Sequence, residues 1–206
     1  MPKEIELTVY DIDREEILRK LKECGAVFVG KYHFKTVNFQ LETVNQIKSL
    51  GIDKDDEKYY TAWIRIRTDG TSTTLTLKEQ YGSTIMKRNE YEVSVDDFLK
   101  TIKIIMKLKP TMQYTYIESE REEYKLGLVV IDINKRQKLP YSIEIEAPSK
   151  VLVDETYRKL DIKKEPMKNV AVNDFEFYRL FGVDYSEVSH ENAIKLGKML
   201  EELDKI

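Results

Sequence analysis

Apolar and polar residues alternate with a period of two along much of the chain, a pattern typical of strands with one buried face. The segment EIELTV at residues 4–9 has this alternation without interruption. Asp69-Gly70 and Gly127 separate pairs of such segments and indicate tight hairpin turns. The pattern predicts eight strands, at residues 4–9, 26–41, 60–68, 72–80, 86–95, 112–124, 128–133 and 141–147.

Helical periodicity takes over between and after these strands. Asp13 with Glu16 resembles a capping box, and Gly25 is placed to end the helix that it begins. Asp96 and Ser149 are placed to cap two later helices. Because hairpins dominate the strand set, we expect an antiparallel α+β fold and not a βαβ stack. The predicted helices lie at residues 13–24, 43–50, 97–109, 148–160, 173–181 and 189–203.

Charged residues occupy the polar positions of the same strands, opposite the apolar ones. A sheet with one solvated face would also alternate, but its surface would normally mix both signs of charge. Here six strands each carry one sign, which indicates a shared charged cavity. The acidic positions are Glu4, Glu6, Glu90, Glu92, Asp132, Glu144 and Glu146, and the basic positions are Arg65, Arg67 and Lys78.

These charges suggest a ligand. Two glutamates at i and i+2 lie about 6.6 Å apart along a strand, so several pairs facing one space repel unless a cation intervenes. Mg²⁺ and Mn²⁺ prefer carboxylate oxygens and often bind a substrate phosphate as well. Arg65 and Arg67 can make bidentate contacts to phosphate, and Lys78 adds a point charge. A closed antiparallel barrel with a polar interior could hold such a polyphosphate and its metal.

Composition narrows the function classes. The 206 residues include 34 Lys and Arg against 37 Asp and Glu, which gives a net charge of −3 and argues against a globally basic nucleic-acid binder. No apolar run approaches the ~18 residues of a membrane span, and the N-terminal residues lack a signal-peptide core. We therefore expect a soluble cytoplasmic protein without membrane contact. The sequence contains no phosphate-loop, GxGxxG, CxxC or HExxH motif, and we expect the single cysteine, Cys24, to be structural.

Seven short motifs carry the charged positions in a fixed order: EIELT, WIRIRTDG, TLTLKEQ, NEYEVSV, SEREEY, VVIDI and SIEIEAPS. Each motif alone is weak, but their order and spacing together are fairly specific. In these motifs the chain resembles the CYTH superfamily, the triphosphate tunnel metalloenzymes, over about residues 2–160. This superfamily includes class IV adenylate cyclases, thiamine triphosphatases and inorganic tripolyphosphatases.

The resemblance implies an α+β fold in which an eight-stranded antiparallel closed β-barrel, the triphosphate tunnel, has helices packed on its outside. The tunnel domain would cover residues 1–160, and residues 161–206 would form a helical extension packed on the barrel. The resemblance assigns binding of Mg²⁺ or Mn²⁺ to Glu4, Glu6, Glu92, Asp132, Glu144 and Glu146. It assigns phosphate binding to Arg65, Arg67, Lys78 and Arg121. The catalytic residues that it implies are Glu4, Glu6, Lys78 and Arg121.

The chain departs from the family pattern at several positions. Thr8 replaces the signature lysine of the first strand, and Ser119 stands where a lysine is common. Asn38 and Gln40 stand where a tyrosine and an aspartate are usual. Thr8 can hydrogen-bond a phosphate but cannot carry a positive charge. We therefore include Thr8 in the predicted substrate-binding set, with Lys35 as a substitute cation.

The sequence thus predicts a metal-dependent enzyme that hydrolyses a triphosphate, whether tripolyphosphate, thiamine triphosphate or a nucleoside triphosphate. A class IV adenylate cyclase that makes cyclic AMP from ATP is the first alternative, although the sequence has no readable adenine-recognition motif. A non-catalytic protein that binds polyphosphate or nucleotide is the second. The expected partner is a triphosphate-containing small molecule and not a nucleic acid, and the oligomeric state stays open, a homodimer included.

Overall fold

A computed structural model describes residues 5–41, 61–81, 87–108, 113–166 and 174–205. The chain forms two compact units, and each combines an earlier with a later part of the sequence. The first unit consists of Met1–His33 and Glu118–Tyr185, and the second of Phe34–Ile117 and Ser186–Ile206. The helix expected at residues 43–50 lies outside the described part of the chain.

The described residues contain an eight-stranded sheet with the order β1-β8-β7-β6-β2-β3-β4-β5. The pairs β1–β8, β7–β8, β6–β7, β2–β3, β3–β4 and β4–β5 are all antiparallel. With its helices, this sheet confirms the predicted fold class. The strands are β1 (Ile5–Tyr10), β2 (Val27–Gln40), β3 (Thr61–Thr68), β4 (Thr73–Tyr81), β5 (Lys87–Ser94), β6 (Tyr114–Leu126), β7 (Val129–Arg136) and β8 (Ser142–Ala147).

Helices follow the strands in the order that the sequence predicts. In the described residues they are α1 (Arg14–Glu23), α3 (Phe98–Leu108), α4 (Lys150–Lys159), α5 (Asp174–Leu180) and α6 (Tyr185–Leu203). None of these is both long enough and apolar enough to cross a membrane. The division of the chain into a domain at 1–160 and an extension at 161–206 stays a prediction.

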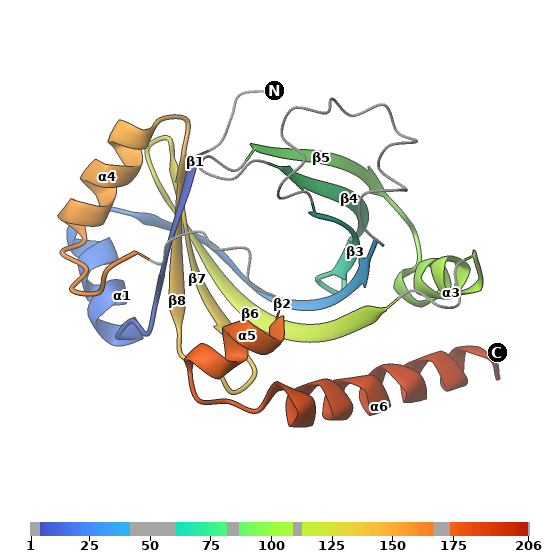
Figure 1. Ribbon diagram of the computed structural model, residues 1–206. Helices are drawn as coiled ribbons and strands as arrows, with labels where there is room; N and C mark the ends of the chain where they lie inside the picture. The colour runs from blue at the N-terminus through green and yellow to red at the C-terminus, as the bar shows by residue number, and fades with distance from the viewer. Residues whose placement is uncertain (1–4, 42–60, 82–86, 109–112, 167–173, 206) are drawn as a thin grey trace. The chain divides into compact units, whose positions relative to one another are not determined.

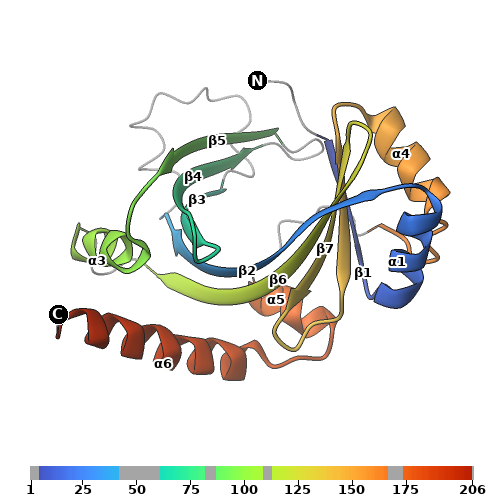
Figure 2. The same ribbon diagram turned by 180° about the vertical axis from the view of Figure 1, so that it is seen from behind.

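The core of the first unit lies on the apolar face of β1, β7 and β8. Ile131, Ile143 and Ile145 are fully buried there, packed in one cluster with Leu21 of α1 and Val153 of α4. Figure 1 and, from behind, Figure 2 show both helices on the same side of these strands. Burial of each such side chain stabilises the fold by about 1.5–3 kcal/mol, so this face requires helices over it. The reverse face of the same strands is left to polar residues.

The core of the second unit joins two helices to the strands. Val37, Phe39 and Ile66 are fully buried, and Ile102 of α3 and Leu196 of α6 pack against them. An ion pair between Lys103 and Asp204 also links α3 to the end of α6. The C-terminal helix therefore covers the apolar face of β2 and β3 within this unit.

Polar side chains determine where the helices begin. Asp13 caps α1 as predicted, since its carboxylate accepts a hydrogen bond from the Glu16 amide at 3.1 Å. At α3 the Lys100 amide donates to Asp97 at 2.9 Å, so Asp97 is the cap and the prediction of Asp96 is wrong by one residue. The capping side chain must directly precede the first helical residue to reach the amide three positions on.

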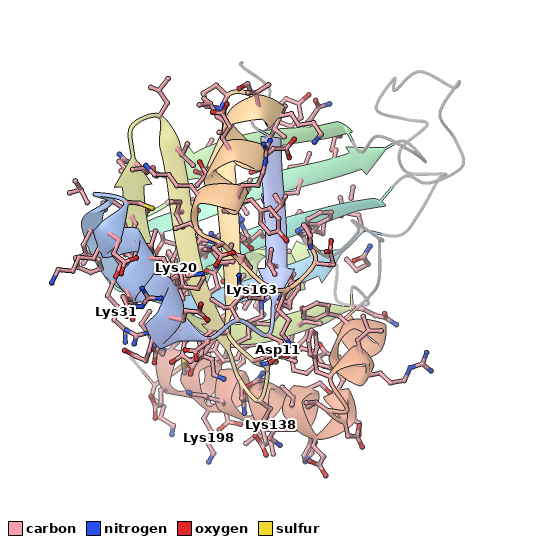
Figure 3. All side chains as sticks on the ribbon, turned by 90° about the vertical axis from the view of Figure 1, so that its left-hand side faces the viewer. Asp11, Lys20, Lys31, Lys138, Lys163 and Lys198 are labelled. Carbon is pink, nitrogen blue, oxygen red and sulfur yellow. The ribbon has the colours of Figure 1, made fainter. Side chains whose placement is uncertain are left out.

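A buried lysine ties α1 to the segment that follows α4. The Lys20 amine donates to the backbone carbonyl of Asp161 at 2.8 Å and to its carboxylate at 3.1 Å. The Glu16 carboxylate lies 3.1 Å from the same nitrogen. Figure 3 shows Lys20 between the two elements. Because an unpaired buried ammonium is costly, these three contacts hold both helices against the same face of the sheet.

The turn between β3 and β4 has the Asp69-Gly70 sequence that predicted it. The Asp69 carboxylate accepts hydrogen bonds from the amides of Thr71 and Ser72, each at 2.8 Å. Gly70 has a φ of 93°, a backbone conformation in which any residue with a side chain would be strained. The amides of Ser72 and Thr71 stabilise the charged carboxylate and lower the pKa of Asp69 to about 2.

We predict that Asp69→Asn destabilises the protein at neutral pH. The difference in free energy of unfolding between the variant and the wild type should narrow as the pH falls. The charged carboxylate is stabilised in the folded state, so its contribution is present above the unfolded pKa of 3.8 and is lost as the pH falls through about 2. Urea unfolding from neutral pH to about pH 3 measures the narrowing. Asp96→Asn, at an exposed position of the same unit, is the control. A difference that does not change with pH would contradict the prediction.

Candidate functional site

Strand register gathers most of the predicted acidic residues of the first unit on one face. Glu6 lies opposite Glu146 and Thr8 opposite Glu144, and Glu144 also lies opposite Asp132 of β7. Directly opposed residues of neighbouring strands project from the same side of a sheet, here the side away from the isoleucine core. We call this side the acidic face, and it carries Glu6, Thr8, Arg121, Asp132, Asn134, Glu144 and Glu146.

Arg121 connects two carboxylates of the acidic face. Its Nη1 lies 2.6 Å from Asp132 Oδ2, and its Nη2 lies 3.3 Å from Glu144 Oε2. Its Nε donates to Asn134 Oδ1 at 3.0 Å. Asp132 is buried, whereas Arg121 and Glu144 are half-buried, so water screens these contacts only in part. Arg121 is therefore the counter-ion that lets Asp132 and Glu144 share this space.

The second unit has a polar face of its own. Arg65 of β3 lies opposite Thr76 of β4, which lies opposite Glu92 of β5. Lys78 lies opposite Glu90 in the same way. Cations from β3 and β4 thus meet carboxylates from the edge strand β5. We call this side the mixed face, and it carries Arg65, Arg67, Thr76, Lys78, Glu90 and Glu92.

Hydrogen bonds join the cations of the mixed face to its glutamates. Lys78 Nζ donates to Glu90 Oε1 at 2.5 Å. Arg65 Nη2 donates to Glu92 Oε2 at 3.3 Å, and the Thr76 hydroxyl donates to the same oxygen at 2.7 Å. The charges are therefore compensated across three strands, and an anionic ligand would have to compete with the glutamates for these donors.

The surroundings of Lys78 on the mixed face lower the pKa of its ammonium group. Burial lowers the pKa of the Lys78 ammonium, and the positive charges of Arg65 and Arg67 lower it further, while Glu90 opposes both effects. An incoming phosphate would favour the charged form, as Glu90 does. Lys78 can therefore bind a phosphate as a cation, and it releases a proton more readily than an exposed lysine does.

Arg67 and Lys35, both predicted to bind substrate, lie on different faces. The Arg67 guanidinium lies 4.9 Å from the centre of the Phe34 ring. Lys35 lies opposite Thr68 in the β2–β3 register, one residue out of phase with Arg65 and Arg67. The structure therefore brings Arg67 to the mixed face and does not bring Lys35 there.

The donor chemistry of the acidic face fits a hard divalent cation, because Glu6, Glu144 and Glu146 offer oxygen ligands from two adjacent strands. The Thr8 hydroxyl donates to the Glu6 carboxylate at 3.3 Å and orients it. Within the described ranges, no three His, Cys, Asp or Glu side chains already lie together as a metal-binding group. Glu4, the remaining predicted ligand, lies outside those ranges. Arg121 occupies the space between two of the carboxylates.

Glu90, which the sequence places among the acidic positions without assigning it a role, binds Lys78. Asn134 is a member of the acidic face that the sequence does not predict. Asn134 accepts a hydrogen bond from Arg121 and stands two positions after Asp132 on the same strand. Because Asn134 is neutral, the pattern of charged positions in the sequence does not include it.

Solved structures with low sequence identity share the fold of this chain. The PH1012 protein of Pyrococcus horikoshii OT3 is 22% identical, with a TM-score of 0.62, 81% of this chain and 96% of that chain being covered. A conserved hypothetical protein from Pyrococcus furiosus is 21% identical, also with a TM-score of 0.62, over 81% of this chain and 98% of that chain. A putative adenylyl cyclase from Hippeastrum, described as having a dominant triphosphatase activity, is 13% identical, with a TM-score of 0.52, over 86% of this chain and 95% of that chain.

No curated protein matches the sequence. The CYTH domain matches residues 52–174, which are more than half of the 206 residues. This range contains the strands β3 to β8, and therefore the whole mixed face and the part of the acidic face that β6, β7 and β8 carry. The EIELT motif precedes the matched range. On this match, the chain belongs to the CYTH domain family.

Proposed function

We propose that this chain hydrolyses a triphosphate in a reaction that depends on a divalent metal ion. The observation that carries the proposal is the pairing of cations with carboxylates on both polar faces, as in Lys78 with Glu90 and Arg121 with Asp132. Phosphate oxygens and a divalent cation together are the partners that could replace such pairs without leaving a charge uncompensated. The dominant triphosphatase activity ascribed to the Hippeastrum relative supports the same reaction class.

Phosphate binding in this proposal depends on four cations. Arg65 and Arg67 offer planar groups of donors that match phosphate oxygens, whereas Lys78 is a point charge. Thr8 contributes a hydroxyl beside the carboxylates. Arg121 completes the set of cations. That the acidic face and the mixed face line one tunnel stays a prediction.

The metal would be held by four glutamates, and Glu92 and Asp132 would assist. A bound Mg²⁺ or Mn²⁺ supplies Lewis-acid polarisation of a phosphoryl oxygen and neutralises part of the phosphate charge. The proposed ligands are Glu4, Glu6, Glu144 and Glu146.

The chain's own cations stabilise the charge that builds up on the transferred phosphoryl group. Arg65, Arg67 and Arg121 neutralise this charge as donors that stay protonated. Lys78 holds a proton at Nζ and can donate a hydrogen bond to the leaving phosphate oxygen. Catalysis then consists mainly of positioning and electrostatic stabilisation, as expected for phosphoryl transfer.

Product analysis separates this function from its alternatives. The chain is incubated with tripolyphosphate, thiamine triphosphate or ATP, each with Mg²⁺ or Mn²⁺, and phosphate, pyrophosphate and cyclic AMP are measured. Release of phosphate supports the proposed hydrolysis and identifies the preferred substrate. Cyclic AMP with pyrophosphate would establish the cyclase alternative, and binding without turnover would establish a binding protein.

The expected cytoplasmic location and the oligomeric state also stay predictions.

We predict that Glu144→Gln combined with Glu146→Gln lowers metal-dependent turnover at least about 100-fold, because two oxygen ligands lose their charge. Steady-state phosphate release across Mg²⁺ concentrations measures the loss. The matched control is Glu118→Gln with Glu120→Gln, which removes two carboxylates at the same spacing from the other face, where Glu120 pairs with Lys31. Turnover by the Glu144 and Glu146 variant that equals that of the wild type at the same magnesium concentrations would refute the metal assignment.

Arg121→Ala should bind Mn²⁺ more tightly than the wild type in the absence of phosphate, because a competing counter-ion of Asp132 and Glu144 is gone. The same variant should bind tripolyphosphate about 10- to 100-fold more weakly, since one charge-assisted contact is lost. Mn²⁺ titration followed by electron paramagnetic resonance, and calorimetry with tripolyphosphate, measure the two effects. Arg14→Ala, which breaks an ion pair with Glu122 on the other face, is the control. Weaker Mn²⁺ binding by Arg121→Ala would contradict the role of Arg121 as a competing counter-ion.

Thr8→Lys should increase the rate of tripolyphosphate hydrolysis, because it adds a cation next to the carboxylates of the acidic face. Adding Ser119→Lys on the same side of β6 should increase the rate further. Neither change should disturb the fold, since a hydrated polyanion site solvates an ammonium far better than a dry core does. Steady-state hydrolysis across pH compares the variants, with Thr8→Met as an uncharged control of similar length. No gain in either variant would mean that lysine at these positions does not limit the rate.

A further inference from the structure

The acidic face continues past its carboxylates to the ends of β1 and β7. Asn134 lies opposite Arg121, and Arg136, the last residue of β7, lies opposite Ser119 of β6. Tyr10, the last residue of β1, lies opposite Ser142 on the same side of the sheet. This end therefore carries hydrogen-bond donors and a positive charge where the middle of the face carries carboxylates.

Two donors at this end have no acceptor within the described residues. The side-chain amide nitrogen of Asn134 is buried and has no hydrogen-bond partner there, although Asn134 Oδ1 accepts from Arg121. Arg136 makes no ion pair with any described residue, and its contact is with the Phe177 ring. In contrast, Lys78 and Arg121 are bound to carboxylates. A buried donor left without an acceptor costs about 1–3 kcal/mol, so such a group commonly marks the place of a ligand.

Helix α5 provides an apolar wall for this end. The Phe177 ring centre lies 5.0 Å from that of Tyr10 and 5.8 Å from the Arg136 guanidinium carbon. Phe181 packs on both aromatic rings, at 5.6 Å from Tyr10 and 5.5 Å from Phe177. Figure 1 shows α5 at the end of β7 and β8. Phe177 is buried and Arg136 is half-buried against it, so the wall shields part of the guanidinium from water and strengthens its interaction with an anion.

The groups at this end favour a phosphate over other ligands. The aromatic rings pack against one another edge to face, so they do not present an open platform on which a nucleobase could stack. Arg136 has a planar set of donors that matches two phosphate oxygens, and the Asn134 amide adds a further donor. Arg136 also lies close enough to Tyr10 to affect its titration. Burial raises the pKa of the Tyr10 hydroxyl, and the positive charge of Arg136 opposes that rise.

We propose that Asn134 and Arg136 form an additional phosphate subsite, in which Phe177 of α5 positions Arg136 and the ligand is one phosphate group of a linear polyphosphate. The inference rests on the proposed function, because it extends the triphosphate site along the acidic face. It also gives the C-terminal part of the chain a role in substrate binding. Arg136 contacts the substrate in this arrangement, whereas Phe177 is a positioning residue.

Calorimetry with tripolyphosphate, without divalent metal so that no turnover occurs, tests the subsite. Arg136→Ala should weaken binding about 10- to 100-fold, and Asn134→Asp, which replaces the amide donor by a carboxylate oxygen, at least about 10-fold. Phe177→Leu should weaken binding in the wild-type background and have little effect when combined with Arg136→Ala. Arg136→Lys should restore part of the affinity, since the charge remains but the planar donors are lost.

Lys135→Ala is the matched control, because Lys135 is the neighbouring cation of β7 but binds the Leu139 carbonyl and the Tyr141 ring on the opposite face. Its affinity for tripolyphosphate should equal that of the wild type. Thermal unfolding is recorded for every variant, and binding is compared at a temperature where all are folded. If Arg136 only anchors α5, Arg136→Ala lowers the melting temperature and leaves the affinity unchanged, which overturns the inference alone. No binding of tripolyphosphate by the wild type would overturn the inference and the proposed function together.

Discussion

Most strands carry apolar side chains on one face and charged side chains on the other. The need to bury the apolar face decides how the other elements are arranged. An isoleucine face such as that of Ile131, Ile143 and Ile145 must be covered, and α1 and α4 cover it in the first unit. Once the helices occupy that side, the carboxylates of the same strands are left together on the other. The core thus determines which side of the sheet can bind a ligand.

Gathering charges on one side creates a second problem, which the chain solves by pairing across strands. Arg121 neutralises Asp132 and Glu144 in the first unit, and Glu90 neutralises Lys78 in the second. Removal of one partner from a half-buried pair leaves the other uncompensated, which is costly. A ligand that brings both an anion and a cation avoids that cost. In the proposed function the metal and the triphosphate therefore act as one complementary pair of replacements, and binding of each favours binding of the other.

Strand alternation is the part of the fold and site that the sequence predicts best, because a period of two fixes the face of each residue once the strand is recognised. The faces of Glu144 and Arg65 follow from it, whereas the Asp69-Gly70 turn follows from the turn preference of that dipeptide. Lys35 follows the same rule. It is in phase with the buried Val37 and Phe39, so its prediction as a substitute cation did not use the alternation of its own strand.

Contacts between distant segments of the chain could not be predicted from the sequence. The packing of Phe177 on Tyr10 and Arg136 joins α5 to strands far earlier in the chain, and no local pattern encodes it. The neutral Asn134 likewise becomes part of the site only through its register with Arg121. The alternation therefore predicted the faces of charged residues such as Glu144 and Arg65, but it did not predict a role for Asn134 or Arg136, which depends on contacts between distant segments.

A crystal structure of the protein with Mn²⁺ and tripolyphosphate is the most direct measurement of the central claim. We expect an anomalous manganese signal at the carboxylates of Glu6, Glu144 and Glu146, with phosphate groups bound by Arg65, Lys78 and Arg121. We also expect Arg121 to turn from Asp132 toward the phosphate. Manganese and tripolyphosphate bound away from the acidic and mixed faces, or no binding at either face, would contradict it.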